Sequence, residues 1–203
     1  MIKFNIVTYG DSNTYGYSPD GSRYTDRYSV VLNRLLGEDY IVHEEGVVGR
    51  TTVYSDIREG RIGVDSINDE LAKYDKIDLL IIMLGTNDYK IKNARLLSEI
   101  EYGMDSLLQK VIKLNNLSKI LLISPILLAK NIDILDKEFD HNSYILSECA
   151  ATVYESLAKK YNINFFDAKL VAYPGSDGEH FTQESHISLA NSLAEIIRGV
   201  DLI

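Results

Sequence analysis

Short apolar segments alternate along this chain with longer segments of mixed polarity, and this alternation is the strongest constraint on its fold. The apolar runs are residues 2–7, 40–43, 79–84, 120–124 and 163–166. Parallel strands need a long crossover connection, usually a helix, so this order is typical of an α/β protein. We therefore predict five parallel strands that are connected by helices.

The expected helices follow from spacing and from stop signals. We predict a helix over residues 28–36, because Gly37 follows as a stop signal. We predict two more over residues 96–114 and 144–161, which carry apolar side chains at three- and four-residue intervals. A last helix is expected over residues 183–198, with one apolar face. The runs at 79–84 and 120–124 do not alternate between apolar and polar residues, which predicts strands in the middle of the sheet, covered on both faces.

Size and charge limit the classes of function. The chain has 203 residues, which predicts a single domain over residues 1–203. A formal charge of -9 would repel phosphate backbones and anionic lipid surfaces, so we expect neither nucleic acid nor a membrane as a partner. Cys149 is the only cysteine, and the N-terminus lacks the long uncharged core of a signal peptide. A cytoplasmic location is the resulting expectation.

Polar segments follow several of the predicted strands. Residues 10–14 follow the first run, 46–52 the second, 85–88 the third and 177–180 the fifth. The carboxyl ends of parallel strands share one edge of the sheet, which is where such folds bind ligands. Each segment taken alone also has a plain structural interpretation, because Gly, Asp, Ser and Asn form turns and cap helices.

One serine, one histidine and one aspartate in these segments form a candidate catalytic relay. Asp177 precedes His180 by three residues, so a single tight turn can point its carboxylate at one ring nitrogen and leave the other as a base. Ser12 would then be the nucleophile, as acyl transfer requires. The other histidines are His43, His141 and His186, and surface or packing roles suit them better.

Acyl transfer also needs donors for the negative charge that develops on the carbonyl oxygen. The natural donors in these loops are the backbone N–H of Ser12, the backbone N–H of Gly49 and the side-chain amide of Asn87. We therefore predict an oxyanion hole made of these three residues.

Four blocks of this sequence resemble those of the SGNH, or GDSL-type, hydrolases. The blocks are Gly10-Asp11-Ser12-Asn13-Thr14, Gly46-Val47-Val48-Gly49-Arg50, Gly85-Thr86-Asn87-Asp88 and Asp177-Gly178-Glu179-His180. They occur in the family's order, and the flanking residues look most like the bacterial arylesterase and acyltransferase branch. The resemblance implies a flavodoxin-like three-layer sandwich, the roles given above for the relay and the oxyanion hole, and no metal or organic cofactor.

Two departures from the family's pattern concern the substrate pocket. Asn13 stands where the family's short name has Leu, and Tyr15 and Tyr17 stand where the arylesterase branch has Trp, a residue this chain lacks. Glu179 puts a charge beside the proposed base. We hypothesise that Glu179 disfavours anionic substrates, so that Glu179→Ile should help a negatively charged ester more than a neutral one.

Four residues are expected to contact the substrate: Asn13, Tyr17, Ile126 and Glu179. Residues 126–142 follow the fourth predicted strand at the same edge, so they can form a wall of the pocket, and helix packing is the alternative use of this segment. A homo-oligomer is compatible with the sequence.

The sequence therefore predicts a serine esterase that cleaves short, acetyl-type esters through an acyl-Ser12 intermediate, with acyl transfer as a competing outcome. A carbohydrate deacetylase is the nearest alternative, and a thioesterase or lysophospholipase shares the same machinery. From another class, a flavodoxin-like module could bind phosphate at residues 10–16, but no G-x-x-x-x-G-K-[ST] or G-x-G-x-x-G pattern is present.

Overall fold

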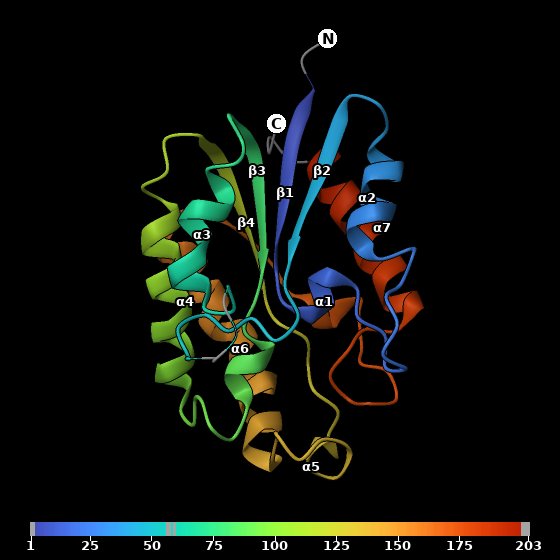
Figure 1. The fold of residues 1–203 in the computed structure, drawn as a ribbon, viewed down its shortest axis with the longest axis vertical. Coiled ribbons are helices and arrows are strands. Elements are labelled where there is room, and N and C mark those ends of the chain that lie inside the picture. Colours follow the sequence, from blue (N-terminus) through green and yellow to red (C-terminus); the bar gives the residue numbers. More distant parts are fainter. Residues whose placement is uncertain (1–2, 56–57, 59, 200–203) are drawn as a thin grey trace.

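The computed structural model describes residues 3–55, 58 and 60–199, and the apolar runs form a parallel sheet at its centre (Figure 1). The strand order is β2-β1-β3-β4-β5. The strands are β1 (Phe4–Gly10), β2 (Tyr40–Gly46), β3 (Ile77–Met83), β4 (Leu117–Ile123) and β5 (Asn164–Phe166). This confirms the predicted five-stranded parallel sheet; residue 2 of the first predicted run lies outside the described residues.

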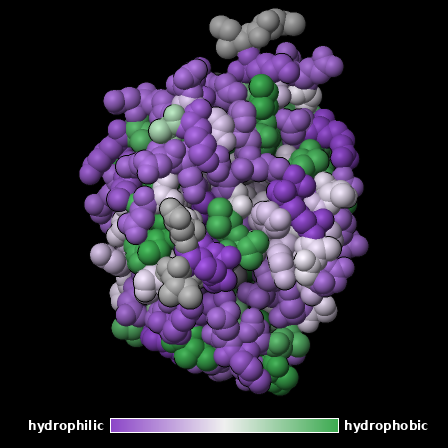
Figure 2. Space-filling model, viewed as in Figure 1, coloured by the Kyte–Doolittle hydropathy of each residue, from purple (hydrophilic) through white to green (hydrophobic). Residues whose placement is uncertain are grey.

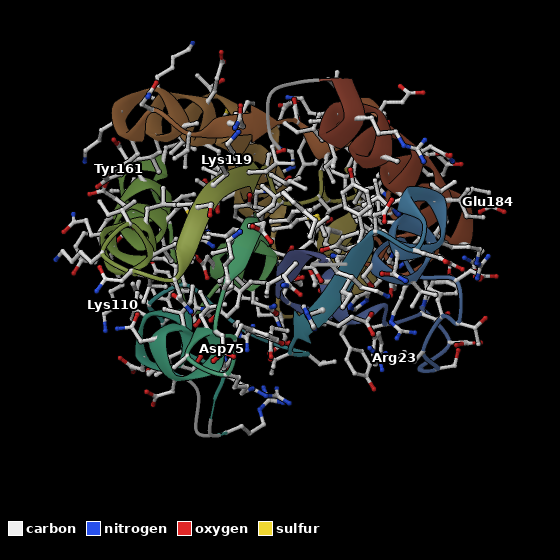
Figure 3. The ribbon with its side chains drawn as sticks, turned by 90° about the horizontal axis from the view of Figure 1, so that it is seen from above. Arg23, Asp75, Lys110, Lys119, Tyr161 and Glu184 are labelled. Atoms are coloured by element: carbon white, nitrogen blue, oxygen red, sulfur yellow. The ribbon has the colours of Figure 1, made fainter. Side chains whose placement is uncertain are left out.

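Helices cover both faces of the sheet. The long ones are α2 (Tyr28–Leu36), α3 (Gly63–Leu71), α4 (Leu97–Val111), α6 (His141–Tyr161) and α7 (Gln183–Gly199). Helices α2 and α7 pack against each other on one face, and α4 packs against both α3 and α6 on the other (Figures 1 and 3). The three-layer α/β arrangement is therefore the one that the sequence predicts.

Some helix bounds differ from the prediction for local reasons. Helix α6 begins at His141 rather than at residue 144, because the carboxylate of Asp140 caps it by accepting from the backbone N–H of Ser143 at 2.9 Å. Helix α3 was not predicted. Four shorter elements lie in the loops: α1 (Ser12–Tyr15), α5 (Ile132–Leu135), η1 (Thr86–Tyr89) and η2 (Ala168–Leu170).

The core follows the sequence pattern of the central strands. Every residue of β3 is buried, as expected for a strand that is covered on both faces and has a neighbouring strand on each side. Figure 2 shows a largely hydrophilic outer face on which hydrophobic residues form small separate groups. Charged side chains such as Arg23, Lys110 and Glu184 lie at the periphery in Figure 3. Within the described part of the chain, no helix combines the length and the apolar character that a membrane crossing needs.

The strand order reverses between β1 and β3, and the register brings their ends together. Gly10 at the end of β1 pairs with Gly46 of β2 and with Met83 of β3. A Cβ atom on Gly10 would lie 2.2 Å from the carbonyl oxygen of Met83, so only glycine allows the chain to turn this tightly against β3. The loops after these strands therefore start at one level, beside the reversal point where α/β sheets bind ligands.

Candidate active site

Ser12 stands at the first position of the short helix α1, two residues after β1 ends. Asp11 caps this helix, since its side chain accepts a hydrogen bond from the backbone N–H of Asn13 at 2.9 Å. The backbone N–H groups of a first helical turn have no acceptor within the helix. The turn therefore holds both the hydroxyl and the backbone N–H of Ser12 at the carboxyl edge of the sheet.

His180 reaches Ser12 from the loop that precedes α7. Its Nε2 lies 2.9 Å from Ser12 Oγ, and its Nδ1 lies 2.7 Å from Asp177 Oδ2. The other carboxylate oxygen of Asp177 accepts from the backbone N–H groups of Glu179 and His180, at 3.1 Å and 3.0 Å. A single turn thus orients the carboxylate toward the ring, and residues 168 positions apart form one hydrogen-bonded chain.

The charges around His180 favour its protonated form. Burial by itself lowers the pKa of His180, but the hydrogen bond that its ring donates to Asp177 and the charges of Glu179, Asp177 and Asp11 outweigh it and raise the pKa above 6.5. Burial also works against the ionised form of Asp177, yet the hydrogen bonds from His180 and from two backbone N–H groups lower the pKa of Asp177. An ionised carboxylate beside a ring with a raised pKa is the arrangement that stabilises an imidazolium.

Asn13 joins the turn of Ser12 to the loop of His180. Its Nδ2 donates to the carbonyl oxygen of Glu179 at 3.0 Å, and its Oδ1 accepts from the backbone N–H of Phe181 at 2.8 Å. These two bonds bracket His180 along the chain. We expected Asn13 to contact the substrate, whereas the structure buries this side chain at 1% exposure and gives it these two hydrogen bonds across the relay.

The two remaining predicted oxyanion donors lie on loops after β2 and β3. Gly49 has a φ of 80°, a conformation that side chains other than glycine rarely adopt. Asn87 donates one amide hydrogen to the carbonyl oxygen of Arg50 at 3.1 Å. Because a side-chain amide has two hydrogens, this bond fixes the orientation of Asn87 and leaves the second one for a ligand.

The same two loops are tied together by buried polar groups that the sequence analysis did not single out. Asp88 accepts from the backbone N–H of Thr52 at 2.9 Å and from its hydroxyl at 2.5 Å, and burial raises the pKa of Asp88 to about 7. The guanidinium of Arg50 is fully buried and donates to the carbonyl oxygens of Gly10 and Glu45, at 3.1 Å and 2.6 Å. It also pairs with both carboxylate oxygens of a glutamate on α3, Glu70, at 2.7 Å.

These bonds hold the ends of β1, β2 and β3 in one fixed arrangement. The one clue in the sequence that Arg50 and Asp88 belong to the site is that they directly follow Gly49 and Asn87.

A cavity of about 400 Å³ opens beside these groups. Its lining includes Ser12, His180, Asp177, Gly49 and Asn87, together with Tyr17, Pro19, Val48, Arg58, Arg61, Lys90, Glu138 and Glu179. The structure therefore brings the predicted relay and the predicted oxyanion donors to one cavity.

Two of the four expected substrate contacts, Tyr17 and Glu179, line this cavity, and the other two, Asn13 and Ile126, do not. The ring of Tyr17 packs on the ring of His180 with 4.7 Å between centroids, and Tyr17 and Glu179 both face the cavity. Ile126 is 1% exposed and lies in the hydrophobic core, outside the cavity lining. The segment over residues 126–142 contributes Glu138 to the lining instead, because its apolar residues Ile126 and Phe139 turn inward.

Glu179 brings a second carboxylate close to the imidazole. Its Oε1 lies 3.8 Å from His180 Nδ1, and its side chain is only 13% exposed. Burial raises the pKa of Glu179 to about 7, although the nearby charges of His180 and Lys90 act in the opposite direction. Near neutral pH this carboxyl group therefore exchanges between its charged and neutral forms.

The other histidines are held apart from the cavity. His186 is fully buried on α7, where its Nδ1 accepts from the backbone N–H of Tyr28 at 3.3 Å, and burial lowers its pKa to about 3. His43 lies 3.2 Å from Asn5 Oδ1, and the ring of His141 stacks on Tyr144. Packing roles fit His186 and His43, and His141 is an exposed surface residue.

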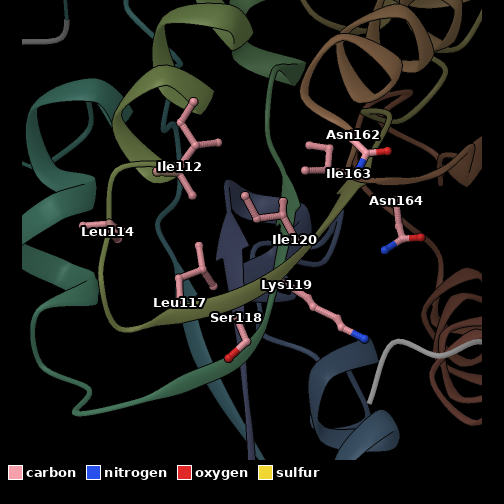
Figure 4. Close-up of a pocket in the computed structure, with 10 residues that line it drawn as sticks. Ile112, Leu114, Leu117, Ser118, Lys119, Ile120, Asn162, Ile163 and Asn164 are labelled. Atoms are coloured by element: carbon pink, nitrogen blue, oxygen red, sulfur yellow. The ribbon is translucent and has the colours of Figure 1, made fainter.

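A second cavity of about 340 Å³ lies at the opposite edge of the sheet (Figure 4). It is bordered by the beginnings of β4 and β5 and includes Leu117, Lys119, Ile120 and Asn164. Since Ser12 stands at the carboxyl edge, this cavity has no part in the relay. Among residues 3–55, 58 and 60–199, no three His, Cys, Asp or Glu side chains gather into a metal-binding group.

Comparison with known proteins adds to this geometry. The model of the GDSL-like lipase/acylhydrolase family matches residues 8–187. A search of curated protein sequences found no match.

Among solved structures, an aryl esterase from M. smegmatis superimposes with a TM-score of 0.87 at 33% identity, covering 98% of this chain and 100% of that one. Est24, a carbohydrate acetylesterase from Sinorhizobium meliloti, does so with a TM-score of 0.86 at 30% identity, covering 97% and 99%. A lipase/acylhydrolase from Enterococcus faecalis, at 19% identity and a TM-score of 0.72 over 97% of this chain and 96% of that one, shares the fold.

Proposed function

This chain belongs to the GDSL-like lipase/acylhydrolase family, and we propose that it cleaves short-chain esters through an acyl intermediate on Ser12. The observation that carries this proposal is the hydrogen-bonded chain from Ser12 Oγ to His180 Nε2, at 2.9 Å, and from His180 Nδ1 to Asp177, at 2.7 Å. The substrate is a small-molecule ester.

In the first step the hydroxyl of Ser12 attacks the ester carbonyl while its proton passes to Nε2 of His180. The carbonyl oxygen becomes an oxyanion, which accepts hydrogen bonds from the backbone N–H groups of Ser12 and Gly49 and from the free amide hydrogen of Asn87. Asp177 stabilises the imidazolium and holds it in place without taking its proton.

The intermediate then collapses, and the proton on Nε2 of His180 goes to the departing alkoxide oxygen as the carbon–oxygen bond breaks. Water enters, gives a proton to the now neutral His180 and attacks the acyl group on Ser12. A second collapse returns the proton to Ser12 Oγ and releases the carboxylic acid. An alcohol in place of the water would give acyl transfer by the same steps.

The size and polarity of the cavity support a short acyl group. A volume of about 400 Å³ must hold both the acyl and the alcohol part of the substrate, and it lies near the small end of the usual range for ligand sites. Apart from the machinery, its lining is mostly charged, and the nonpolar contribution comes from Tyr17, Pro19 and Val48. An acetyl-type group fits such a site better than a long hydrocarbon chain.

A sugar O-acetyl ester is the second candidate substrate. Polar walls that include Glu138, Glu179 and Lys90 offer hydrogen-bond partners for a polyhydroxylated alcohol. The likeness to a carbohydrate acetylesterase supports the same candidate. A panel of aryl acetates, acetylated sugars and thioesters, compared by kcat/KM, separates these substrates.

Labelling with a fluorophosphonate probe tests the proposed nucleophile. We expect one covalent adduct at Ser12 in the wild-type protein, and Ser12→Ala should lose both the adduct and ester turnover by more than about 10⁴-fold. Ser22→Ala is the matched control, because Ser22 is an exposed serine on a nearby loop. Turnover by a folded Ser12→Ala protein, checked by circular dichroism, at near wild-type rate would refute the assignment. A folded wild-type protein without any adduct would favour a ligand-binding role.

A further inference from the structure

Two groups of residues with opposite charge line the catalytic cavity. The first group is Asp177, Glu179 and His180, which we call the imidazole wall. The second group is Gly49, Asn87, Arg58 and Arg61, which we call the guanidinium wall. Lys90 lies in the same cavity and forms an ion pair with Glu138.

The guanidinium of Arg61 approaches Gly49 closely. A Cβ atom built on Gly49 would lie 2.5 Å from Arg61 Nη1 and 3.4 Å from Arg58 Nη2. The glycine therefore serves two purposes: it adopts a φ of 80°, and it leaves room for a guanidinium beside a proposed oxyanion donor. A side chain on residue 49 would require Arg61 Nη1 to shift.

The backbone anchors Arg61 at this position. Its carbonyl oxygen accepts from the backbone N–H of Thr51 at 2.9 Å, and Thr51 forms a parallel bridge with Ile62. Since Thr51 is two residues from Gly49, these contacts hold Arg61 alongside the loop that carries the oxyanion donor. Arg61 is therefore part of the wall through its main chain as well as through its side chain.

Positive charge continues into the recess behind this wall. Gly49 and Asn87 also border a smaller pocket, and the charged residues that line it within the described part of the chain are Arg58, Lys90 and Lys92. The chain as a whole has a formal charge of -9, so a concentration of cations here opposes the average charge of the molecule. Cations gathered around a concave site raise the local concentration of anionic ligands.

We propose that the guanidinium wall binds an anionic group of the substrate, so that the preferred esters carry a carboxylate or a phosphate within reach of Arg58 and Arg61. The planar donors of a guanidinium match the paired oxygens of either group. The ester carbonyl would sit at Ser12, with the anionic group directed away from the carboxylate of Glu179. This inference rests on the proposed esterase function and narrows it to a class of substrate.

Matched pairs of esters test this proposal. The anionic substrates are 4-acetoxybenzoate and 4-acetoxyphenyl phosphate, and the neutral reference is methyl 4-acetoxybenzoate. The quantity compared is the ratio of kcat/KM for the anionic ester to kcat/KM for the neutral one. We expect Arg61→Gln to lower this ratio about tenfold and Arg58→Gln/Arg61→Gln to lower it further. Arg34→Gln, which removes an exposed arginine paired with Asp26 on the surface, should leave the ratio unchanged.

The two anionic esters also distinguish the two kinds of group. A larger loss for 4-acetoxybenzoate assigns the wall to a carboxylate, and a larger loss for the phosphate assigns it to a phosphate. A ratio in the double variant within twofold of the wild-type value would overturn the proposal. An equal loss on both the anionic and the neutral esters would overturn it as well, because the arginines would then act on the reaction and not on the anionic group.

Binding to the Ser12→Ala protein separates this proposal from the esterase function. Calorimetry should show 4-acetoxybenzoate binding at least about tenfold more tightly than its methyl ester, and Ser12→Ala/Arg61→Gln should lose that preference. Equal affinities would refute the anion subsite while leaving the esterase function intact. Turnover of either ester by Ser12→Ala would refute the proposed nucleophile and leave the binding preference to be judged by itself.

Discussion

The imidazole wall and the guanidinium wall differ in charge, and the difference matches the charges that ester cleavage creates. The tetrahedral intermediate places a positive charge on the imidazole and a negative charge on the former carbonyl oxygen. The carboxylates of Asp177 and Glu179 lie beside the imidazole, and the same cavity is lined by the predicted oxyanion donors Gly49 and Asn87 and by the cations Arg58 and Arg61. A cavity with opposite charges on its walls can therefore stabilise charge separation without moving.

The walls also differ in how the chain builds them. The core of the imidazole wall is one turn over residues 177–180, in which a single carboxylate accepts from two backbone N–H groups and faces the ring. The guanidinium wall comes from two loops, after β2 and β3, that are joined by Asp88 and Thr52. A local sequence pattern is therefore enough to predict the imidazole wall. The guanidinium wall forms only because the sheet brings the two loops together.

Removing the orienting carboxylate should have the largest effect on this comparison. Asp177→Asn keeps the shape of the turn but favours the wrong tautomer of His180, so we expect kcat to fall by about 10⁴-fold. Steady-state kinetics on a neutral acetate ester measure this. Asp75→Asn, at an exposed aspartate, is the control and should behave like the wild type. A loss of less than tenfold would mean that Asp177 does not orient the ring.

Truncating the amide on the opposite wall should have the next largest effect. Asn87→Ala removes one donor to the oxyanion, and we expect kcat to fall by about 10²- to 10³-fold while KM changes little. Asn115→Ala, at an exposed asparagine, controls for the loss of an amide elsewhere. A rise in KM with kcat unchanged would assign Asn87 to substrate binding and not to the transition state.

The pH profile tests the charge of the imidazole wall directly. His180 must be neutral to accept the proton of Ser12, so kcat/KM should fall about tenfold per pH unit below its pKa. Since the pKa of His180 is raised, the fall should be centred above pH 6.5, the unperturbed value. Glu179→Gln removes one of the charges that raise this pKa and should move the midpoint to lower pH. A flat profile between roughly pH 5 and 8 would argue against His180 as the base.

The smallest effect is expected from the side chain that opposes the guanidinium wall. Glu179→Ile removes the carboxylate that repels anions, so it should increase kcat/KM for 4-acetoxybenzoate by a few-fold more than for the neutral methyl ester. This change is opposite in sign to that of Arg61→Gln. The same substrate pair measures it, and equal changes for both esters would show that Glu179 does not select by charge.

The sequence predicted the architecture well because burial has a simple pattern. Continuous apolar residues at 79–84 predicted a central strand, and β3 lies between β1 and β4 with every residue buried. Helix α2 has the predicted bounds, residues 28–36, because Gly37 ends it in a conformation with positive φ. Helix α3 went unpredicted, since Val64, Ile67 and Leu71 give only a short apolar stripe and no side-chain cap marks its start.

The individual pocket residues were less predictable. Asn13 and Ile126 were expected at the substrate, but Asn13 bonds to the loop of His180 and Ile126 is buried in the core. Neither residue type reveals which way its side chain points. Nothing in the sequence indicated that Arg58 and Arg61 line the cavity, because arginines in a loop that lines a cavity look the same in a sequence as arginines in a surface loop.

By itself the sequence determined the succession of strands and helices along the chain and the glycines of the turns, because these depend on local spacing and on burial. It also identified Ser12, Asp177 and His180 as the candidate relay. The tertiary structure decided which residues meet in the cavity. Contacts between loops that are far apart in the chain, such as Arg61 against Gly49 or Asn13 against Glu179, depend on strand order and register, and no local pattern encodes them.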